Sequence, residues 1–242
     1  MSIKAHIPNT ITSLNHACGA AGVVCVGLGH PQAAFCLMLG GAVADFFDGL
    51  SARALGAYSP MGKELDSLAD QVSFGVLPSV MLTAVMFGAV GPQNPLCWIP
   101  MLIAVFSGLR LAKFNIDTRQ TTSFIGMPTP ACAMICGSLA YFVDACPGSA
   151  LTALAQGCWF IPVLSVLLSA LLVCEIPMFS MKMHKGDRIG GRRIAFAAVL
   201  LAAAVAAIIC KWNWSAIVLT AFTAYIIINV AAAAYSKIWK RK

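Results

Sequence analysis

The sequence predicts an all-α fold: a polytopic membrane helix bundle of about eight transmembrane helices with both termini in the cytoplasm. Three observations lead to this fold class. Hydrophobic residues make up 60% of the chain and charged residues only 10%, which is unlike a soluble globular domain. Apolar runs such as 194–210 and 214–235 approach or reach the roughly 20 residues that span a bilayer. The basic residues, finally, gather on alternate connections between such runs.

Turn and breaker residues divide the chain into eight expected spans. The spans cover residues 10–29, 33–56, 64–88, 95–115, 127–146, 158–179, 192–210 and 214–236. The breaks include Gly29-His30-Pro31 and the proline-rich stretch 91–95. Asn9, Asn15 and His16 interrupt the first apolar stretch, and no cleavage pattern follows it, so we expect a retained segment rather than a signal peptide.

The positions of Lys and Arg predict the orientation in the membrane. With the N-terminus in the cytoplasm, the inside segments are 1–9, 49–63, 109–126, 180–193 and 237–242. These segments hold fifteen of the sixteen basic residues, and only Lys211 lies outside. This asymmetry follows the positive-inside rule. The net charge of +7 therefore indicates contact with anionic lipid headgroups and gives no support to nucleic-acid binding.

Four aspartates, in a chain with only nine acidic residues, fall within one stretch at the cytoplasmic edge of the bundle. Asp45 and Asp48 are three residues apart, and Asp66 and Asp70 are four apart. Residues at these spacings share one face of a helix, so two helices can each present a carboxylate pair. Because ionised groups in apolar surroundings are costly unless paired or bound to metal, we expect the pairs to meet around divalent cations, Mg²⁺ or Mn²⁺.

The spacing of this stretch is specific. It reads D-x2-D-G-x2-A-R-x8-G-x3-D-x3-D, with Asp45, Asp48, Gly49, Ala52, Arg53, Gly62, Asp66 and Asp70 at its eight positions. It resembles the signature of the CDP-alcohol phosphotransferase family, membrane enzymes that transfer a phosphoalcohol from a CDP-linked donor to a hydroxyl group. A pyrophosphate donor carries concentrated negative charge, which two carboxylate-bound cations would neutralise during in-line displacement.

The resemblance implies a role for each motif residue. Asp45, Asp48 and Asp66 would bind two divalent cations, and Asp70 would lie at the same metal site and act as the catalytic base. The donor, CDP-diacylglycerol, would be bound by six residues: Asn9, Thr12, Gly49, Ala52, Arg53 and Ser59. The short segment Pro8–Thr12 resembles the family's Asn/Thr motif. Family membership also implies a homodimer, with the active site facing the cytoplasm of a bacterial or archaeal cell membrane.

The flanking sequence is similar to the branch of the family that makes phosphatidylserine. Its motifs are ELDSLAD-x-VSFG over 64–75, RLAKFN over 110–115 and F-x-G-x-PTP over 124–130. If serine is the acceptor substrate, its carboxylate needs a cation, for which Arg110 and Lys113 are candidates. Its ammonium group needs a hydrogen-bond acceptor, for which Glu64 or Asp117 is a candidate. Asn115 could orient either group. Lys113 keeps a charge but loses the guanidinium fork that is common in this branch.

The expected architecture is one membrane-embedded domain over 1–242, with a catalytic core at about 8–180 and accessory helices at about 192–236. The expected reaction is transfer of the phosphatidyl group of CDP-diacylglycerol to the hydroxyl of L-serine. Two alternatives remain open. Glycerol 3-phosphate or an inositol phosphate could be the acceptor, or the acidic residues could belong to a divalent-cation transporter.

Overall fold

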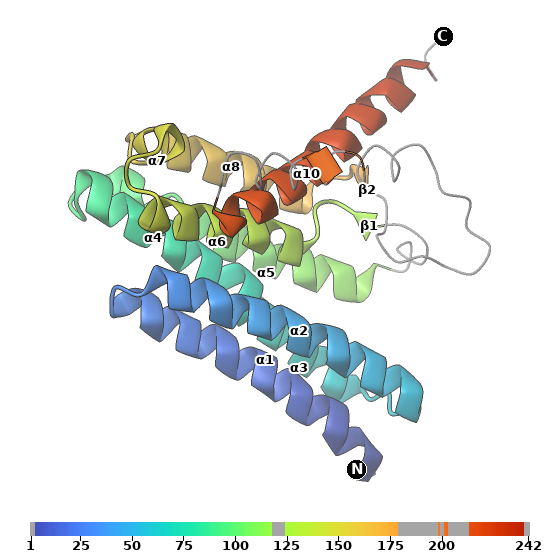
Figure 1. Ribbon diagram of the computed structural model, residues 1–242. Coiled ribbons are helices and arrows are strands. Elements are labelled where there is room, and N and C mark those ends of the chain that lie inside the picture. The colour runs from blue at the N-terminus through green and yellow to red at the C-terminus, as the bar shows by residue number, and fades with distance from the viewer. Residues whose placement is uncertain (1–2, 118–123, 179–197, 199–200, 203–212, 240–242) are drawn as a thin grey trace.

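The computed structural model describes residues 3–117, 124–178, 198, 201–202 and 213–239, which form a bundle of helices (Figure 1). The α-helices are α1 (Ile3–Gly27), α2 (Pro31–Leu55), α3 (Pro60–Asp70), α4 (Leu77–Val90), α5 (Met101–Ile116), α6 (Thr129–Ala145), α7 (Ala150–Ala155), α8 (Phe160–Val173) and α10 (Trp214–Trp239). A π-helix, η1 (Gln71–Val76), and a 3₁₀-helix, η2 (Pro95–Trp98), complete the helical elements in these ranges. The predicted all-α membrane bundle is confirmed.

In the described ranges, four helical segments are long and apolar enough to span a membrane. They are Pro31–Leu55, Pro60–Val90, Pro95–Ile116 and Trp214–Tyr235. Helices α6 and α8 are apolar but shorter. Helix α1 is 25 residues long, and its polar first half separates it from these four. The expected span 192–210 and the basic segment 180–193 lie largely or wholly outside the described residues, so eight spans and cytoplasmic termini remain predictions.

The first three helices form the part of the bundle that carries the acidic motif. Helices α1 and α2 lie side by side, and α3 packs against α1 (Figure 1). Helix α3 continues through η1 into α4 as one segment, Pro60–Val90. The π-helix begins directly after Asp70, and π-helical turns inside longer helices are frequently found at functional sites.

The buried core is centred on α6, which packs mainly against α2, α4 and α10, and nearly every residue of α6 up to Ala140 is buried. The β-structure in the described ranges consists of two short antiparallel strands, β1 (Phe124–Ile125) and β2 (Pro177–Met178). Backbone bonds from Gly126 to Ile176 (2.9 Å) and from Met127 to Leu171 (2.9 Å) continue this pairing. These bonds connect the segment before α6 to the end of α8. Thr129, the first residue of α6, lies beside α5, where it accepts a hydrogen bond from Arg110.

Candidate functional site

Three of the four predicted carboxylates meet where α2 faces α3. One carboxylate oxygen from each of Asp45, Asp48 and Asp66 lies within 4.8 Å of the other two. Negative charges at this separation repel one another unless a cation compensates them. Carboxylate oxygens are the ligands that Mg²⁺ and Mn²⁺ prefer. The residues therefore fit a divalent metal, as the sequence predicts, although the ion and the number of ions remain predictions.

Asp70 lies one helical turn beyond Asp66 and is not part of that three-residue group. Its Oδ1 accepts a hydrogen bond of 3.2 Å from the Asn15 side-chain amide, which comes from α1. Asp70 is close enough to the other three carboxylates to interact with them electrostatically. This position beside the group, rather than within it, is compatible with a base that faces the substrate.

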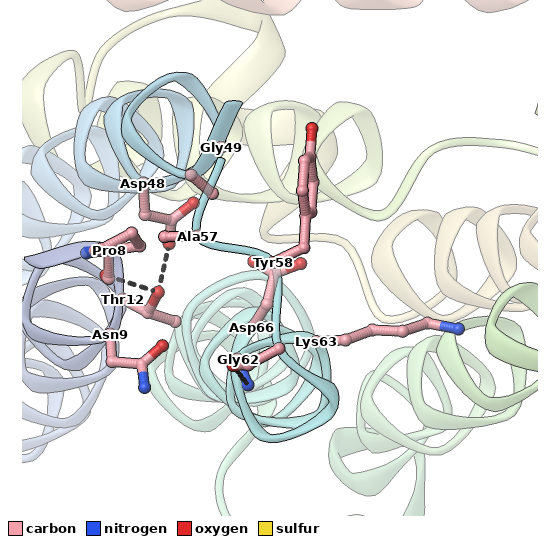
Figure 2. A pocket seen from close by; sticks show the side chains of 12 residues that line it. Pro8, Asn9, Thr12, Asp48, Gly49, Ala57, Tyr58, Gly62, Lys63 and Asp66 are labelled. Carbon is pink, nitrogen blue, oxygen red and sulfur yellow. Dashed lines mark hydrogen bonds between the residues drawn. The ribbon is translucent and has the colours of Figure 1, made fainter. Parts of the chain in front are cut away.

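Thr12 on α1 holds one of the clustered carboxylates. Its hydroxyl donates a 2.6 Å hydrogen bond to Asp48 Oδ2, and the backbone oxygen of Pro8 lies 3.0 Å from the same hydroxyl (Figure 2). Thr12 is 3% exposed and Asp48 is 6% exposed. A hydroxyl has one hydrogen to donate, and the shorter bond to an ionised acceptor is the stronger one. Thr12 therefore orients Asp48 within the cluster.

A cavity of about 210 Å³ opens beside the carboxylates. Its walls come from α1, α2, α3 and the connection between α2 and α3 (Figure 2). The lining residues are Pro8, Asn9, Thr12, Asp48, Gly49, Ala52, Ala57, Tyr58, Ser59, Gly62, Lys63 and Asp66. Five of the six residues predicted to bind the donor are among them. The side chain of Lys63 points away from the other labelled residues, and its Nζ donates to the Asn115 carbonyl at 2.9 Å (Figure 2).

The connection between α2 and α3 is shaped by its end residues. Gly56 has φ +59°, a left-handed conformation that ends α2, and the Ala57 amide donates back to the Ala52 carbonyl at 3.0 Å. Ser59 then caps α3, because its hydroxyl accepts from the Gly62 amide at 3.0 Å. A Cβ on Gly62 would lie 3.0 Å from Asn9 Oδ1, so glycine permits the close approach of α1 and α3 at the cavity.

Arg53 is the predicted donor-binding residue that does not line the cavity. It is exposed, and its Nε donates to the Gly49 carbonyl at 2.8 Å. The side chain therefore lies along α2 against a residue of the cavity wall. Its contact with donor phosphates remains a prediction.

Arg110, in contrast, is buried inside the bundle. It is 8% exposed, its Nη1 donates to Thr129 Oγ1 at 2.9 Å, and its guanidinium lies 5.6 Å from the centre of the Phe114 ring. It interacts electrostatically with Asp70. Its Nε is buried without a hydrogen-bond partner in the described part of the chain. A buried cation in this state is suited to an anionic ligand.

The other predicted acceptor residues lie nearer the surface. Lys113 borders a small cavity together with Arg110, with room of about 10 Å³, and forms an ion pair with Glu175 at 3.4 Å. The Asn115 side-chain amide donates to Ser67 Oγ at 2.8 Å, which ties α5 to α3, and Glu64 is exposed. The structure thus brings Lys113 to Arg110, while Asn115 and Glu64 do not line that cavity.

The sequence analysis did not assign two residues that the structure connects to the site. Asn15 binds Asp70, and Thr129 binds Arg110. Asn15 follows Thr12 by three residues, which puts both on one face of α1. A polar residue at that spacing in an apolar segment is a signal that could have identified Asn15. No local signal connects Thr129 to Arg110.

Comparisons with known proteins agree with this geometry. The sequence model of the CDP-alcohol phosphatidyltransferase family matches residues 5–171. The CDP-diacylglycerol–serine O-phosphatidyltransferase of Bacillus subtilis is 39% identical over 129 residues, which cover 53% of this chain and 72% of that protein. The protein of the same name from Mycobacterium bovis is 32% identical over 249 residues, covering 98% and 83%.

A third relative has a different name. The archaetidylserine synthase of Methanothermobacter thermautotrophicus is 34% identical over 140 residues, covering 54% of this chain and 56% of that protein. The family match spans α1 to α8 and contains the whole carboxylate cluster, its cavity and Arg110. With this match, the motif and its observed geometry, the chain belongs to the CDP-alcohol phosphatidyltransferase family.

Proposed function

We propose that this protein transfers the phosphatidyl group of CDP-diacylglycerol to the hydroxyl of L-serine, forming phosphatidylserine and CMP. The observation that carries the proposal is the group of Asp45, Asp48 and Asp66 beside a cavity that the donor-motif residues line. The names of the relatives from Bacillus subtilis and Mycobacterium bovis support serine as the acceptor.

The three clustered carboxylates would hold two divalent cations, Mg²⁺ or Mn²⁺. When bound, these cations neutralise the donor pyrophosphate and the charge that develops on the departing CMP. Thr12 keeps Asp48 in place for this task through its 2.6 Å hydrogen bond. The small residues Gly49 and Ala52 leave space for the nucleotide against α2, and Asn9 and Ser59 supply polar atoms at the cavity wall.

Asp70 would act as the general base. In the proposed step the serine oxygen attacks the phosphorus that carries diacylglycerol, and the bond from that phosphorus to the CMP oxygen breaks. The serine proton passes to the Asp70 carboxylate. Asn15 restrains that carboxylate by binding Oδ1, which leaves Oδ2 for the proton. Phosphatidylserine stays in the membrane, and CMP leaves to water.

Arg110 would bind the serine carboxylate. It is buried and makes no ion pair within the part of the chain that the structure describes, where the recorded pair joins Lys113 to Glu175. It also interacts electrostatically with Asp70, the proposed base. Lys113 borders the same small cavity but is paired with Glu175, and an acceptor with a phosphate would require more positive charge than the Arg110 guanidinium provides.

We further propose that the site faces the cytoplasm of a bacterial or archaeal cell membrane, because the basic segments flank it. In this arrangement the nucleotide approaches from water while the acyl chains remain in lipid. A homodimer and a single domain over 1–242, with a core at about 8–180, complete the proposal. Cross-linking in native membranes tests the dimer.

The test of the reaction uses purified protein in vesicles that contain CDP-diacylglycerol. Labelled serine, glycerol 3-phosphate and inositol phosphate are supplied separately, and CMP release and labelled lipid are measured. We expect both products with serine alone. Absence of CMP release with serine would refute the proposal, and product from a phosphorylated acceptor would replace serine with that acceptor. Metal uptake into vesicles without nucleotide would instead support a transporter.

A further inference from the structure

Helix α10 lies beyond the family match, which ends at residue 171, yet it packs against a helix of the core. Its partner is α6, whose first residue, Thr129, binds Arg110. The sequence motifs assign no role to α10, and most of its surface is outside the bundle. One of its side chains, Tyr225, is nevertheless only 2% exposed.

The register between α10 and α6 brings Tyr225 to the level of Thr129. Trp214 Nε1 donates to the Tyr141 hydroxyl at 3.2 Å, and the two ring centres are 4.8 Å apart. In Figure 1, α6 runs from β1 toward α7, and α10 runs the opposite way and passes β2. From this contact, Thr129 is twelve residues back along α6 and Tyr225 is eleven residues forward along α10. At 1.5 Å per residue both lie about 17 Å from the contact.

Tyr225 and Arg110 therefore lie at the same end of α6. The Tyr225 hydroxyl interacts electrostatically with the Arg110 guanidinium. Asn229 lies one helical turn after Tyr225 and is fully buried, and its side-chain amide donates to the Tyr225 backbone carbonyl at 2.8 Å, so this face of α10 is turned into the bundle. A buried phenol hydroxyl gains from a polar partner, and a guanidinium has five donors to share.

We propose that Tyr225 is a positioning residue, which holds the Arg110 guanidinium between α6 and the acceptor and so sets the affinity for the acceptor's carboxylate. This inference rests on the proposed role of Arg110 in binding that carboxylate. It gives the C-terminal helix a part in acceptor recognition, whereas donor and metal binding stay with α1, α2 and α3. Removal of a polar group that faces a buried charge corresponds to about a tenfold effect on affinity.

The test is the variant Tyr225→Phe in the full-length protein, which removes one hydroxyl and keeps the ring. With labelled serine and CDP-diacylglycerol in vesicles, we expect the KM for serine to rise about tenfold, with kcat and the KM for CDP-diacylglycerol within about twofold of wild type. Tyr235→Phe is the matched control, because Tyr235 lies on the same helix and is 65% exposed. It should leave all three constants unchanged.

A double-mutant cycle distinguishes an effect of Tyr225 that acts through Arg110 from a general effect on the structure. If Tyr225 acts through Arg110, Tyr225→Phe in an Arg110→Lys background should add less than twofold to the KM for serine. An unchanged KM for serine in Tyr225→Phe, equal rises for both substrates, or full additivity with Arg110→Lys would overturn the role of Tyr225. Wild-type protein that transfers nothing to serine would overturn the proposed function instead, so the two failures are distinguishable.

Discussion

Replacement of Thr12 by valine tests whether the observed contact to Asp48 organises the metal site. The change removes a hydroxyl that donates a 2.6 Å hydrogen bond to Oδ2 of a carboxylate that is 6% exposed. A hydrogen bond to a charged group contributes about 1.5–3 kcal/mol, and 1.4 kcal/mol is a factor of ten in affinity. Loss of a residue that orients a metal ligand typically lowers metal affinity by about 10- to 100-fold. We expect a decrease in that range for Thr12→Val.

The assay is the concentration of Mg²⁺ or Mn²⁺ that gives half-maximal CMP release, measured at saturating CDP-diacylglycerol and serine. Binding of Mn²⁺ observed by electron paramagnetic resonance provides a second readout that does not depend on turnover. The variant Thr12→Ser keeps the hydroxyl, so it should stay within about threefold of wild type. Thr10→Val is the matched control, because Thr10 is exposed on the same helix and its hydroxyl donates to the His6 carbonyl at 2.8 Å.

An unchanged metal requirement in Thr12→Val would refute this reasoning, since Asp48 would then be held by other contacts. Equal weakening in Thr12→Val and Thr10→Val would also refute it. That result would mean that the loss comes from the helix and not from the hydrogen bond to Asp48.

Three further predictions concern the base, the metal and the packing of α1. Asp70→Asn should lower turnover about 10²- to 10⁴-fold while CDP-diacylglycerol binding is retained, and near-normal turnover would remove Asp70 from the base role. Chelation with EDTA should abolish CMP release, which excess Mg²⁺ or Mn²⁺ should restore; activity that survives chelation would contradict a metal-dependent site. Gly19→Ala should lower the free energy of unfolding by about 1–3 kcal/mol, because a Cβ there would lie 2.8 Å from Ser73 Cα. Gly27→Ala, whose Cβ would meet nothing within 4 Å, is its control in thermal unfolding, and equal shifts would contradict the packing argument.

Sequence alone predicted the residues that form the carboxylate cluster. The three-residue interval between Asp45 and Asp48 places both on one face of a helix, whatever the rest of the fold does. The same logic applies to Asp66 and Asp70, although only Asp66 joins the three-residue group. The cost of placing several charges in an apolar environment then requires that the two faces meet. The membrane class followed from composition for the same energetic reason.

The sequence could not rank the basic residues by environment. Arg53 and Arg110 both lie in the second half of an apolar helix, and both are candidates for binding an anionic group. In the structure Arg53 is exposed and bonds its own helix at Gly49, whereas Arg110 is buried against Thr129 from another helix. Burial of this kind depends on how helices cross and on which segment covers them, and neither quantity is encoded by spacing within one helix.

What the sequence by itself determined is therefore local: the apolar spans, the basic flanks, and which carboxylates share a helix face. The tertiary structure alone decided that Asn15 reaches Asp70 across 55 residues, that Thr12 reaches Asp48 across 36, and that α10 brings Tyr225 to the end of α6. The physical reason is that helical periodicity fixes a side chain's direction about its own axis. The rotation and register of one helix against another arise only from the packing of side chains that are distant in sequence.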